Sequence, residues 1–409
     1  MPELAGRSGI LPTQWLRKAG DRGIIISPTY TLEDRQFQPA SIDLRLGDWA
    51  YRLQCSFLPG DSTVRAKLPN YAMERIDLRD GAVLERNRPY LIPLAEELKL
   101  PPTLFGRANP KSSTGRLDIF TRVITDRSVF FDNIAQGYHG PLFLEVVSRS
   151  FTIRLKRGLS LNQLRLSVPA PPFHGEALKE MHLADPLVFV GGRPLSQLNA
   201  GLGPNGILLS LQLGETPCRE RVGWRARRNS QLLDLAKERA HHPNDFWEPV
   251  YPERGGGVIL EPEEFYLLLS KESVRIRPDL AAEMVAYDTT SGELRTHYAG
   301  FFDPGFGYSE CGSSAGSKVA LEVRAHDVAF KLEDGQRVCR LAFEPLIEPP
   351  ETPYGAKSHY QFQASTLSKH FISGDLDQES AAAPPLGQTD AVGGSARARD
   401  QEPALQSLF

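Results

Sequence analysis

Apolar and polar residues alternate over short runs along most of the chain. Residues 151–155 and 328–332 show this period of two, and Gly, Pro and Asp residues separate such runs. A period of two is typical of β-strands with one buried face. Helical spacing is scarce and predicts helices at residues 12–18 and 230–240. The pattern therefore predicts a mainly β protein with few short helices.

The sequence also resembles itself. Ser112 aligns with Thr289 and Glu145 with Glu322, in both cases at an offset of 177 residues. The alignment extends over more than fifty residues, and self-similarity of that length indicates an internal duplication. The two repeats cover about residues 20–170 and 188–347.

Prolines and composition divide the chain further. Consecutive prolines near residue 170 cannot donate to a sheet and indicate a connector. The end of the chain has few large apolar residues, so burial cannot offset its ordering entropy. The predicted segments are a first domain at 1–170, a linker at 171–187, a second domain at 188–371 and a disordered tail at 372–409.

Composition excludes several classes of protein. A chain of 409 residues with 41% hydrophobic content can bury two cores, and a formal net charge of -3 provides no general attraction to nucleic acid. No apolar run is long enough for a membrane helix, and the N-terminus does not resemble a signal peptide. Four scattered cysteines fit neither a zinc knuckle nor a disulfide scaffold. We expect a cytoplasmic protein with reduced thiols and no membrane partner.

The segment Lys-Ser-Ser-Thr-Gly-Arg at residues 111–116 combines two cations, three hydroxyls and a glycine. Hydroxyls, backbone N–H groups and a guanidinium can together bind phosphate oxygens. A Ser/Thr-rich turn with flanking charges is also common as a solvated loop. The segment lacks the residue order of a Walker loop.

A Leu-Glu-Val sequence occurs once in each repeat, within an apolar strand pattern. Glu145 and Glu322 therefore either face solvent or lie in a pocket that raises their pKa. Residues 297–306 predict a strand followed by an Asp-Pro-Gly turn, which by itself is only good turn chemistry. A zinc site built on His174 and Cys218 is not expected, because Arg221 stands where a second cysteine would be needed.

These motifs, in this order, resemble the metal-independent dCTP deaminase family of the deoxyuridine triphosphatase-like superfamily. Residues 38–47 resemble the N-terminal strand signature of the family, and residues 111–116 its Arg-Ser-Ser-x-x-Arg phosphate loop. Residues 297–306 resemble its hairpin, and Glu322 stands in its Leu-Glu motif, whose carboxylate is the catalytic base. The resemblance implies two tandem β-clip domains, each a distorted barrel.

The two repeats depart from the family pattern in opposite ways. In the second repeat Asp288 and Glu293 replace the cations of the phosphate loop and would repel a triphosphate. The first repeat keeps the loop but replaces Asp-Pro-Gly with a longer turn at residues 132–137. In this family one subunit supplies the phosphate loop and its neighbour the base pocket. We therefore predict one composite site, built from the loop of the first repeat and the pocket of the second.

The resemblance implies a set of site residues. Glu322 is the expected base and proton shuttle, with Glu145 as the alternative, and Ser112 is a candidate to position the water. The substrate-binding residues implied are Lys111, Ser112, Ser113, Arg116, Ala299, Asp303, Gln336, Tyr354, His359 and Gln363. His359 stands where the family usually has lysine.

The implied activity is hydrolysis of dCTP to dUTP and ammonia without zinc, with Mg2+ carried on the triphosphate. This would supply pyrimidine deoxyribonucleotide synthesis. A bifunctional enzyme that forms dUMP and a non-catalytic nucleotide-binding regulator remain alternatives. The resemblance implies a homo-oligomer, while the oligomeric state and any dTTP effector stay open.

Overall fold

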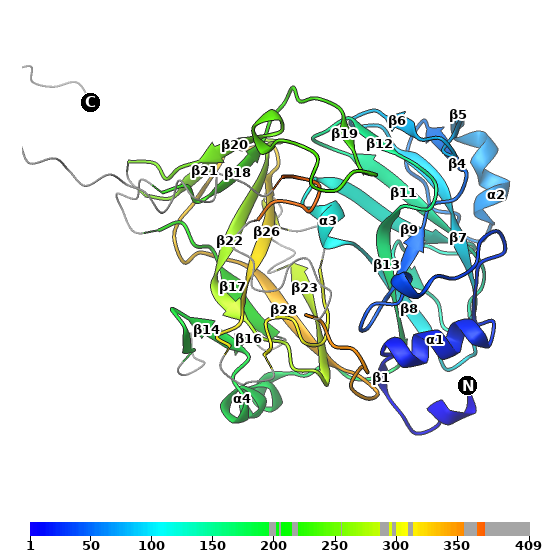
Figure 1. The fold of residues 1–409 in the computed structure, drawn as a ribbon, viewed down its shortest axis with the longest axis horizontal. Coiled ribbons are helices and arrows are strands. Elements are labelled where there is room, and N and C mark those ends of the chain that lie inside the picture. The colour runs from blue at the N-terminus through cyan, green and yellow to red at the C-terminus, as the bar shows by residue number, and fades with distance from the viewer. Residues whose placement is uncertain are drawn as a thin grey trace, which may run out of the picture. The chain divides into compact units, whose positions relative to one another are not determined.

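The structure is a computed structural model that describes residues 1–195, 202–203, 206–214, 220–254, 256–286, 294–296, 300–309, 314–355 and 366–372. They belong to one compact unit, Met1–Ser373. Strands predominate (Figure 1), which confirms the predicted fold class. The α-helices of the described chain are α1 (Thr13–Asp21), α2 (Val64–Lys67), α3 (Ser112–Gly115) and α4 (Gly175–Ala184). Single 3-10 turns occur at η1 (Pro2–Leu4), η2 (Asp34–Gln36), η3 (Leu68–Asn70) and η4 (Pro243–Asp245).

The first half of the chain, residues 1–170, forms two main antiparallel sheets. One has the order β1 (Gly9–Ile10), β13 (Ser160–Val168), β8 (Phe105–Pro110) and β10 (Asn133–Ile134), with β3 (Ile42–Arg45) also paired to β13. The other has the order β5 (Ala72–Asp77), β4 (Trp49–Leu53), β7 (Tyr90–Lys99), β11 (His139–Ser148) and β9 (Ile119–Thr125), with β2 (Ile25–Ile26) paired to β7.

The second half, residues 171–372, repeats much of this arrangement. One sheet has the order β15 (Arg193–Pro194), β14 (Val188–Val190), β22 (Phe265–Val274), β18 (Gly223–Ala226) and β20 (Trp247–Val250), and β26 (Ser317–Ala325) pairs with β22 and β24 (Leu294–Thr296). Another has the order β16 (Leu202–Gly203), β17 (Gly206–Ser210), β28 (Arg337–Pro345), β23 (Leu280–Ala286) and β25 (Phe301–Phe302). A small sheet joins β21 (Val258–Leu260) to β27 (Phe330–Leu332).

The same pairing pattern recurs around the strands that carry the two glutamates. Strand β11, with Glu145, lies between β7 and β9, and strand β26, with Glu322, lies between β22 and β24. The two runs of period two at residues 151–155 and 328–332 contain β12 (Ile153–Leu155) and β27. Local alternation therefore identified these strands correctly.

The predicted helix at residues 230–240 is wrong. This segment contains β19 (Leu233–Asp234), which pairs in parallel with β12 of the first half, while β12 also pairs with β6 (Ala82–Leu84). The backbone N–H of Leu233 donates to Thr152 O at 3.0 Å, and that of Leu235 to Arg154 O at 2.9 Å. The leucines match helical spacing, but pairing with a distant strand decides the local conformation.

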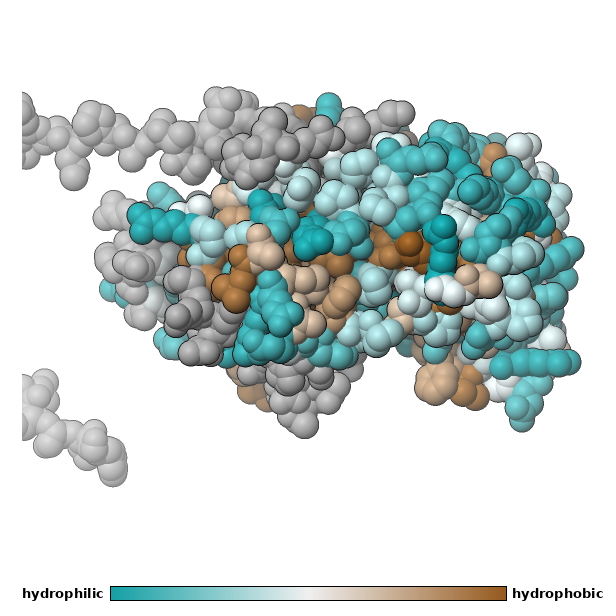
Figure 2. Space-filling model, turned by 90° about the horizontal axis from the view of Figure 1, so that it is seen from below, coloured by the Kyte–Doolittle hydropathy of each residue, from teal (hydrophilic) through white to brown (hydrophobic). Residues whose placement is uncertain are grey.

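Two helices bear on the other predictions. The helix predicted at residues 12–18 is confirmed as α1, which buries Trp15 and Leu16. Helix α4 lies in the segment predicted as a linker, and its Leu178 is buried in the core of the second half. None of the helices among the described residues is long and apolar enough to cross a membrane. On the face shown in Figure 2, apolar side chains form separate patches among hydrophilic ones.

Aromatic rings join the two halves beside β12. Phe151 of the first half packs edge-on against Phe246 and Trp247, with ring centroids 5.6 Å and 5.3 Å apart. Phe371, near the end of the described chain, lies 5.6 Å from Phe246 and 6.0 Å from Trp247. Burial of these rings fixes the C-terminal segment, residues 366–372, against the rest of the fold.

Candidate active site

The predicted phosphate loop forms a single helical turn, α3, between β8 and β9. Lys111 precedes the turn, and its carbonyl accepts hydrogen bonds from the N–H groups of Thr114 and Gly115 at 2.8 Å and 2.9 Å. Ser113 and Arg116 are buried, whereas Ser112 is half-buried. The loop is thus a rigid part of the fold rather than a solvated turn.

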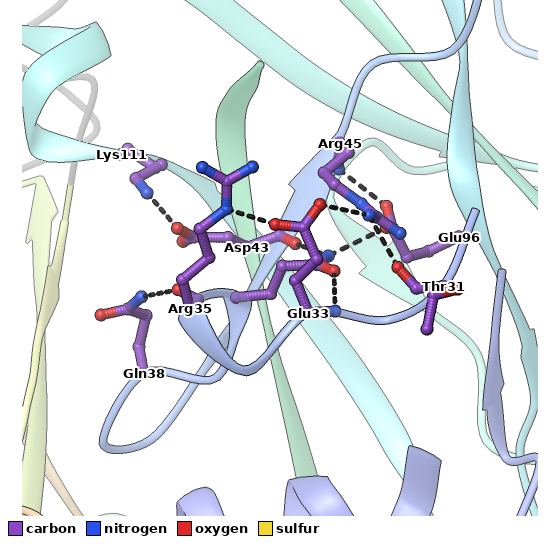
Figure 3. A network of polar contacts seen from close by, with 9 residues as sticks. Thr31, Glu33, Arg35, Gln38, Asp43, Arg45, Glu96 and Lys111 are labelled. Carbon is purple, nitrogen blue, oxygen red and sulfur yellow. Dashed lines mark hydrogen bonds and ion pairs between the residues drawn. The ribbon is translucent and has the colours of Figure 1, made fainter. Parts of the chain in front are cut away.

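Lys111 is the cation at the edge of a larger polar network (Figure 3). Its ammonium pairs with Asp43 on β3, and on the same strand Arg45 pairs with the fully buried Glu96 at 2.8 Å. Glu96 also accepts from Gln36 at 2.9 Å. Burial raises the pKa of Glu96, while its hydrogen bonds to Arg45 oppose that rise. The network holds Lys111 in place through the Asp43 carboxylate, and a phosphate would compete with that carboxylate for the Lys111 ammonium.

A cavity of about 450 Å3 borders the loop at Lys111 and Ser113. Its wall carries more cations than carboxylates, a balance that suits a polyanion. The charged residues of the wall are Arg35, Arg45, Lys111, Lys156, Arg157, Lys369, Asp43 and Glu238.

The C-terminal segment of the second half is fastened to this first-half loop. The guanidinium of Arg116 donates to Thr366 O at 3.2 Å, and the Ser368 hydroxyl donates to Ser113 O at 2.9 Å. The Ser368 oxygen also lies 2.9 Å from His370 Nδ1. Burial lowers the pKa of His370 to about 4, so the imidazole is neutral at pH 7.

The predicted hairpin of the second half meets the strand that leads into the loop. The N–H of Gly300 donates to Asn109 Oδ1 at 2.7 Å. A Cβ at position 300 would lie only 2.8 Å from Met284 O, so a glycine permits this approach. Beyond β25 the predicted Asp-Pro-Gly turn is present, and Gly305 has a φ of 94°.

Asp303 in that turn lies within a charge cluster between the halves. Arg165 on β13 is fully buried, its Nη2 lies 3.6 Å from Asp303 Oδ1, and its guanidinium also donates to Ala282 O and Phe302 O at 3.0 Å and 2.8 Å. Burial raises the pKa of Asp303, and the charges of Arg165 and Lys111 oppose that rise.

Glu145 is already engaged within the first half. It is 1% exposed, and its Oε1 accepts from Arg122 Nε at 3.0 Å on the neighbouring strand β9. The Arg122 guanidinium also lies 3.7 Å from the ring centroid of Phe131. At the offset of 177 residues, Arg122 aligns with Ala299.

Glu322 faces the junction between the halves. Its neighbours Leu321 and Val323 belong to the core of the second half, so Glu322 points to the opposite face of β26. It is 4% exposed and lies opposite Leu267 on β22. On the same face, Arg324 pairs with Asp118, two residues beyond the phosphate loop.

The remaining predicted residues are distributed as follows. The N–H of Tyr354 donates to Pro304 O at 2.8 Å, and its ring lies 5.6 Å from that of Phe306, so Tyr354 does reach the hairpin. The Gln336 side chain accepts from Glu333 N at 3.1 Å, within its own turn. The predictions at Ala299, His359 and Gln363 lie outside the described residues.

Sequence reasoning missed the residues that join the two halves. Asn109, Asp118, Arg165 and Arg324 all make contacts across the junction. Of these four, Arg165 had a signal in the sequence, as an arginine flanked by Leu164 and Leu166.

Two family models match adjacent parts of this chain. The N-terminal domain of 2'-deoxycytidine 5'-triphosphate deaminase matches residues 7–170, and the C-terminal domain matches residues 175–371. The chain belongs to the dCTP deaminase family. This confirms the resemblance drawn from the motifs.

Relatives within the dCTP deaminase family include a solved structure of similar length. The crystal structure of 2'-deoxycytidine 5'-triphosphate deaminase from Agrobacterium tumefaciens is 42% identical, covers 86% of this chain and 99% of its own, and has a TM-score of 0.78. A dUMP-forming dCTP deaminase of Dictyoglomus turgidum is 30% identical over 43% of this chain and 84% of its own. A dCTP deaminase of Natronomonas pharaonis is 32% identical over 30% of this chain and 60% of its own.

Proposed function

We propose that this protein hydrolyses the 4-amino group of dCTP and releases ammonia at a composite site between its two halves. The observation that carries the proposal is the meeting of the hairpin and β26 with the phosphate loop, through Gly300–Asn109 and Arg324–Asp118. These contacts support a site with phosphate ligands from one half and base-pocket residues from the other.

The roles follow from charge and position. Lys111, Ser112, Ser113 and Arg116 bind the triphosphate, and two of them, Lys111 and Ser113, line the cation-rich cavity. We assign Ala299 and Asp303 of the hairpin, together with Gln336, to the pocket for the sugar and base. We assign Tyr354, His359 and Gln363 to a C-terminal segment that covers the triphosphate. Mg2+ bound through the phosphate oxygens, the kind of ligand it prefers, would neutralise part of the triphosphate charge.

Glu322 is the general base in this proposal. Cytosine C4 is a poor electrophile, so a base must deprotonate the attacking water, and an acid must protonate N3. One carboxyl group can do both in turn, and Glu322 is 4% exposed and lies opposite the buried Leu267 on the neighbouring strand. Ser112 would position the water.

Glu145 is less suited to this task. Its ion pair with Arg122 occupies an oxygen that would have to contact the water. The aligned position in the second half carries Ala299 instead of an arginine. The contact with Arg122 therefore favours Glu322 over Glu145 as the working glutamate.

The expected product is dUTP. Direct formation of dUMP is a second candidate, because several relatives are named dUMP-forming dCTP deaminases. Chromatography of the reaction mixture distinguishes dUTP from dUMP, and unlabelled dUTP added to labelled dCTP shows whether free dUTP is an intermediate.

Two matched substitutions test the site. Glu322→Gln should lower kcat for ammonia release by at least about a thousandfold, because the amide cannot accept the proton. Glu145→Gln removes an equivalent carboxylate from the other half and should leave kcat within about tenfold. Full turnover by Glu322→Gln contradicts the composite site. Nucleotide binding without any ammonia release by the unaltered protein indicates a regulator instead of an enzyme.

A further inference from the structure

The ion pair between Arg324 and Asp118 joins the two parts of the proposed site most directly. Arg324 lies two residues after Glu322 on the same strand, and alternation along β26 places both side chains on one face. Asp118 follows Arg116 by two residues, and its N–H donates to Gly115 O at 2.9 Å, at the end of α3. One end of the pair is thus fixed to the glutamate strand and the other to the phosphate loop.

Both members of the pair are held rigidly. Asp118 is fully buried and Arg324 is 5% exposed. The Asp118 carboxylate also accepts from the Ser150 hydroxyl at 2.5 Å, and the Arg324 guanidinium also donates to Glu263 O. Asp118 adopts a left-handed conformation with a φ of 57°, which a non-glycine residue keeps only where its surroundings impose it.

The repeats do not encode an equivalent ion pair between the glutamate strand of the first half and the corresponding loop of the second half. At the offset of 177 residues, Arg324 aligns with Val147 and Asp118 aligns with Arg295. A valine and an arginine cannot form an ion pair with each other. The interaction therefore belongs to one junction only, between the loop of the first half and the glutamate strand of the second.

We propose that Arg324 and Asp118 are positioning residues that set the distance between Glu322 and the nucleotide held by the phosphate loop. The proposal rests on the assigned role of Glu322. A misplacement of about 1 Å at a reacting group can cost about a hundredfold in rate, whereas the triphosphate ligands of the first half stay in place. Loss of the pair should therefore lower kcat and leave KM nearly unchanged.

The test uses two conservative variants of the full chain. Asp118→Asn keeps the size of the side chain but removes its charge, and Arg324→Lys keeps the charge but loses the guanidinium that reaches Asp118 and Glu263 O together. Each should lower kcat for ammonia release 10- to 100-fold with KM for dCTP within threefold of the unaltered protein. The double variant should be no slower than the slower single variant, because both changes break one interaction.

Controls separate positioning from loss of structure. Arg7→Met breaks an exposed ion pair with Glu348 that also joins the two halves, and should leave kcat unchanged. Ser150→Ala removes the hydroxyl that donates to Asp118 and should lower kcat two- to fivefold. Because this change is mild, it still tests the proposal if Asp118→Asn or Arg324→Lys fails to fold. Thermal melting of each variant reports the folded fraction.

The outcomes are distinct. Unchanged kcat in folded Asp118→Asn and Ser150→Ala proteins, a rise in KM at constant kcat, or losses that multiply in the double variant would each overturn the positioning role. Failure of the unaltered protein to release ammonia would instead refute the proposed function itself.

Discussion

Arg165 offers a strong test of how the halves are held together. Its buried guanidinium donates to Ala282 O and Phe302 O and neutralises Asp303 in part, while it also lies 4.0 Å from the ring centroid of Phe301. Arg165→Met keeps the length of the side chain but leaves two carbonyls without these donors and a buried carboxylate without its cation. Removing one partner of a buried ion pair typically costs about 3–5 kcal/mol.

The net loss of stability is smaller than this, because burial of the guanidinium is itself unfavourable and lowers the pKa of Arg165. Asp303, whose pKa burial already raises, can also take up a proton. We therefore expect the free energy of unfolding to fall by about 3 kcal/mol, the low end of the range for a broken buried pair. Urea unfolding followed by circular dichroism measures this as a lower midpoint.

Two further variants show whether the reasoning about charge is right. Adding Asp303→Asn to Arg165→Met should recover about 1–2 kcal/mol, since it removes the unpaired buried charge. Arg7→Met, which breaks an exposed pair, should change stability by less than about 1 kcal/mol. A loss below about 1 kcal/mol in Arg165→Met, or no recovery in the double variant, would refute this account.

Three shorter predictions concern the loop and the segment that contacts it. Lys111→Met should raise KM for dCTP about tenfold or more, whereas Lys111→Arg should keep KM within threefold of the unaltered protein. Steady-state ammonia release measures both values. A KM for Lys111→Met equal to that of the unaltered protein would exclude Lys111 as a phosphate ligand. His370 has a folded pKa of about 4, below its usual 6.5, so its contribution to stability is present above pH 6.5 and lost as pH falls toward 4, by at most about 3 kcal/mol. Melting curves at pH 7.5 and pH 5 should therefore show a larger loss for the unaltered protein than for His370→Asn, and equal losses would contradict the assignment. Ser368→Ala should cost about 1–2 kcal/mol, because the hydroxyl that donates to Ser113 O is buried; an unchanged midpoint in urea would show that the bond contributes nothing.

Features set by neighbouring residues could be predicted from the sequence. The strands at β12 and β27, helix α1 and the Asp-Pro-Gly turn follow from periodicity and turn chemistry over a few residues. The phosphate loop could be identified because its cations and hydroxyls are contiguous. The leucines at residues 232–235 misled the same reasoning, since their partner strand lies some eighty residues earlier.

The site itself depends on contacts between distant residues. Glu145 and Arg122 are separated by 23 positions, and Arg324 and Asp118 by 206. Neither pair can be read from spacing, because strand register and the packing of the two halves decide which side chains meet. Alignment of the repeats did show that they differ in their phosphate loops, but not that Arg122 engages the glutamate of the first.

The pairing of β19 with β12 also bears on whether either half can exist alone. A separately expressed first half would expose the edge of β12, with its unpaired backbone groups, next to the apolar surface that Leu233 and Leu235 normally cover. Open edges of this kind recruit strands from other chains. Such a fragment should aggregate, so limited proteolysis is expected to yield either the paired halves together or insoluble pieces.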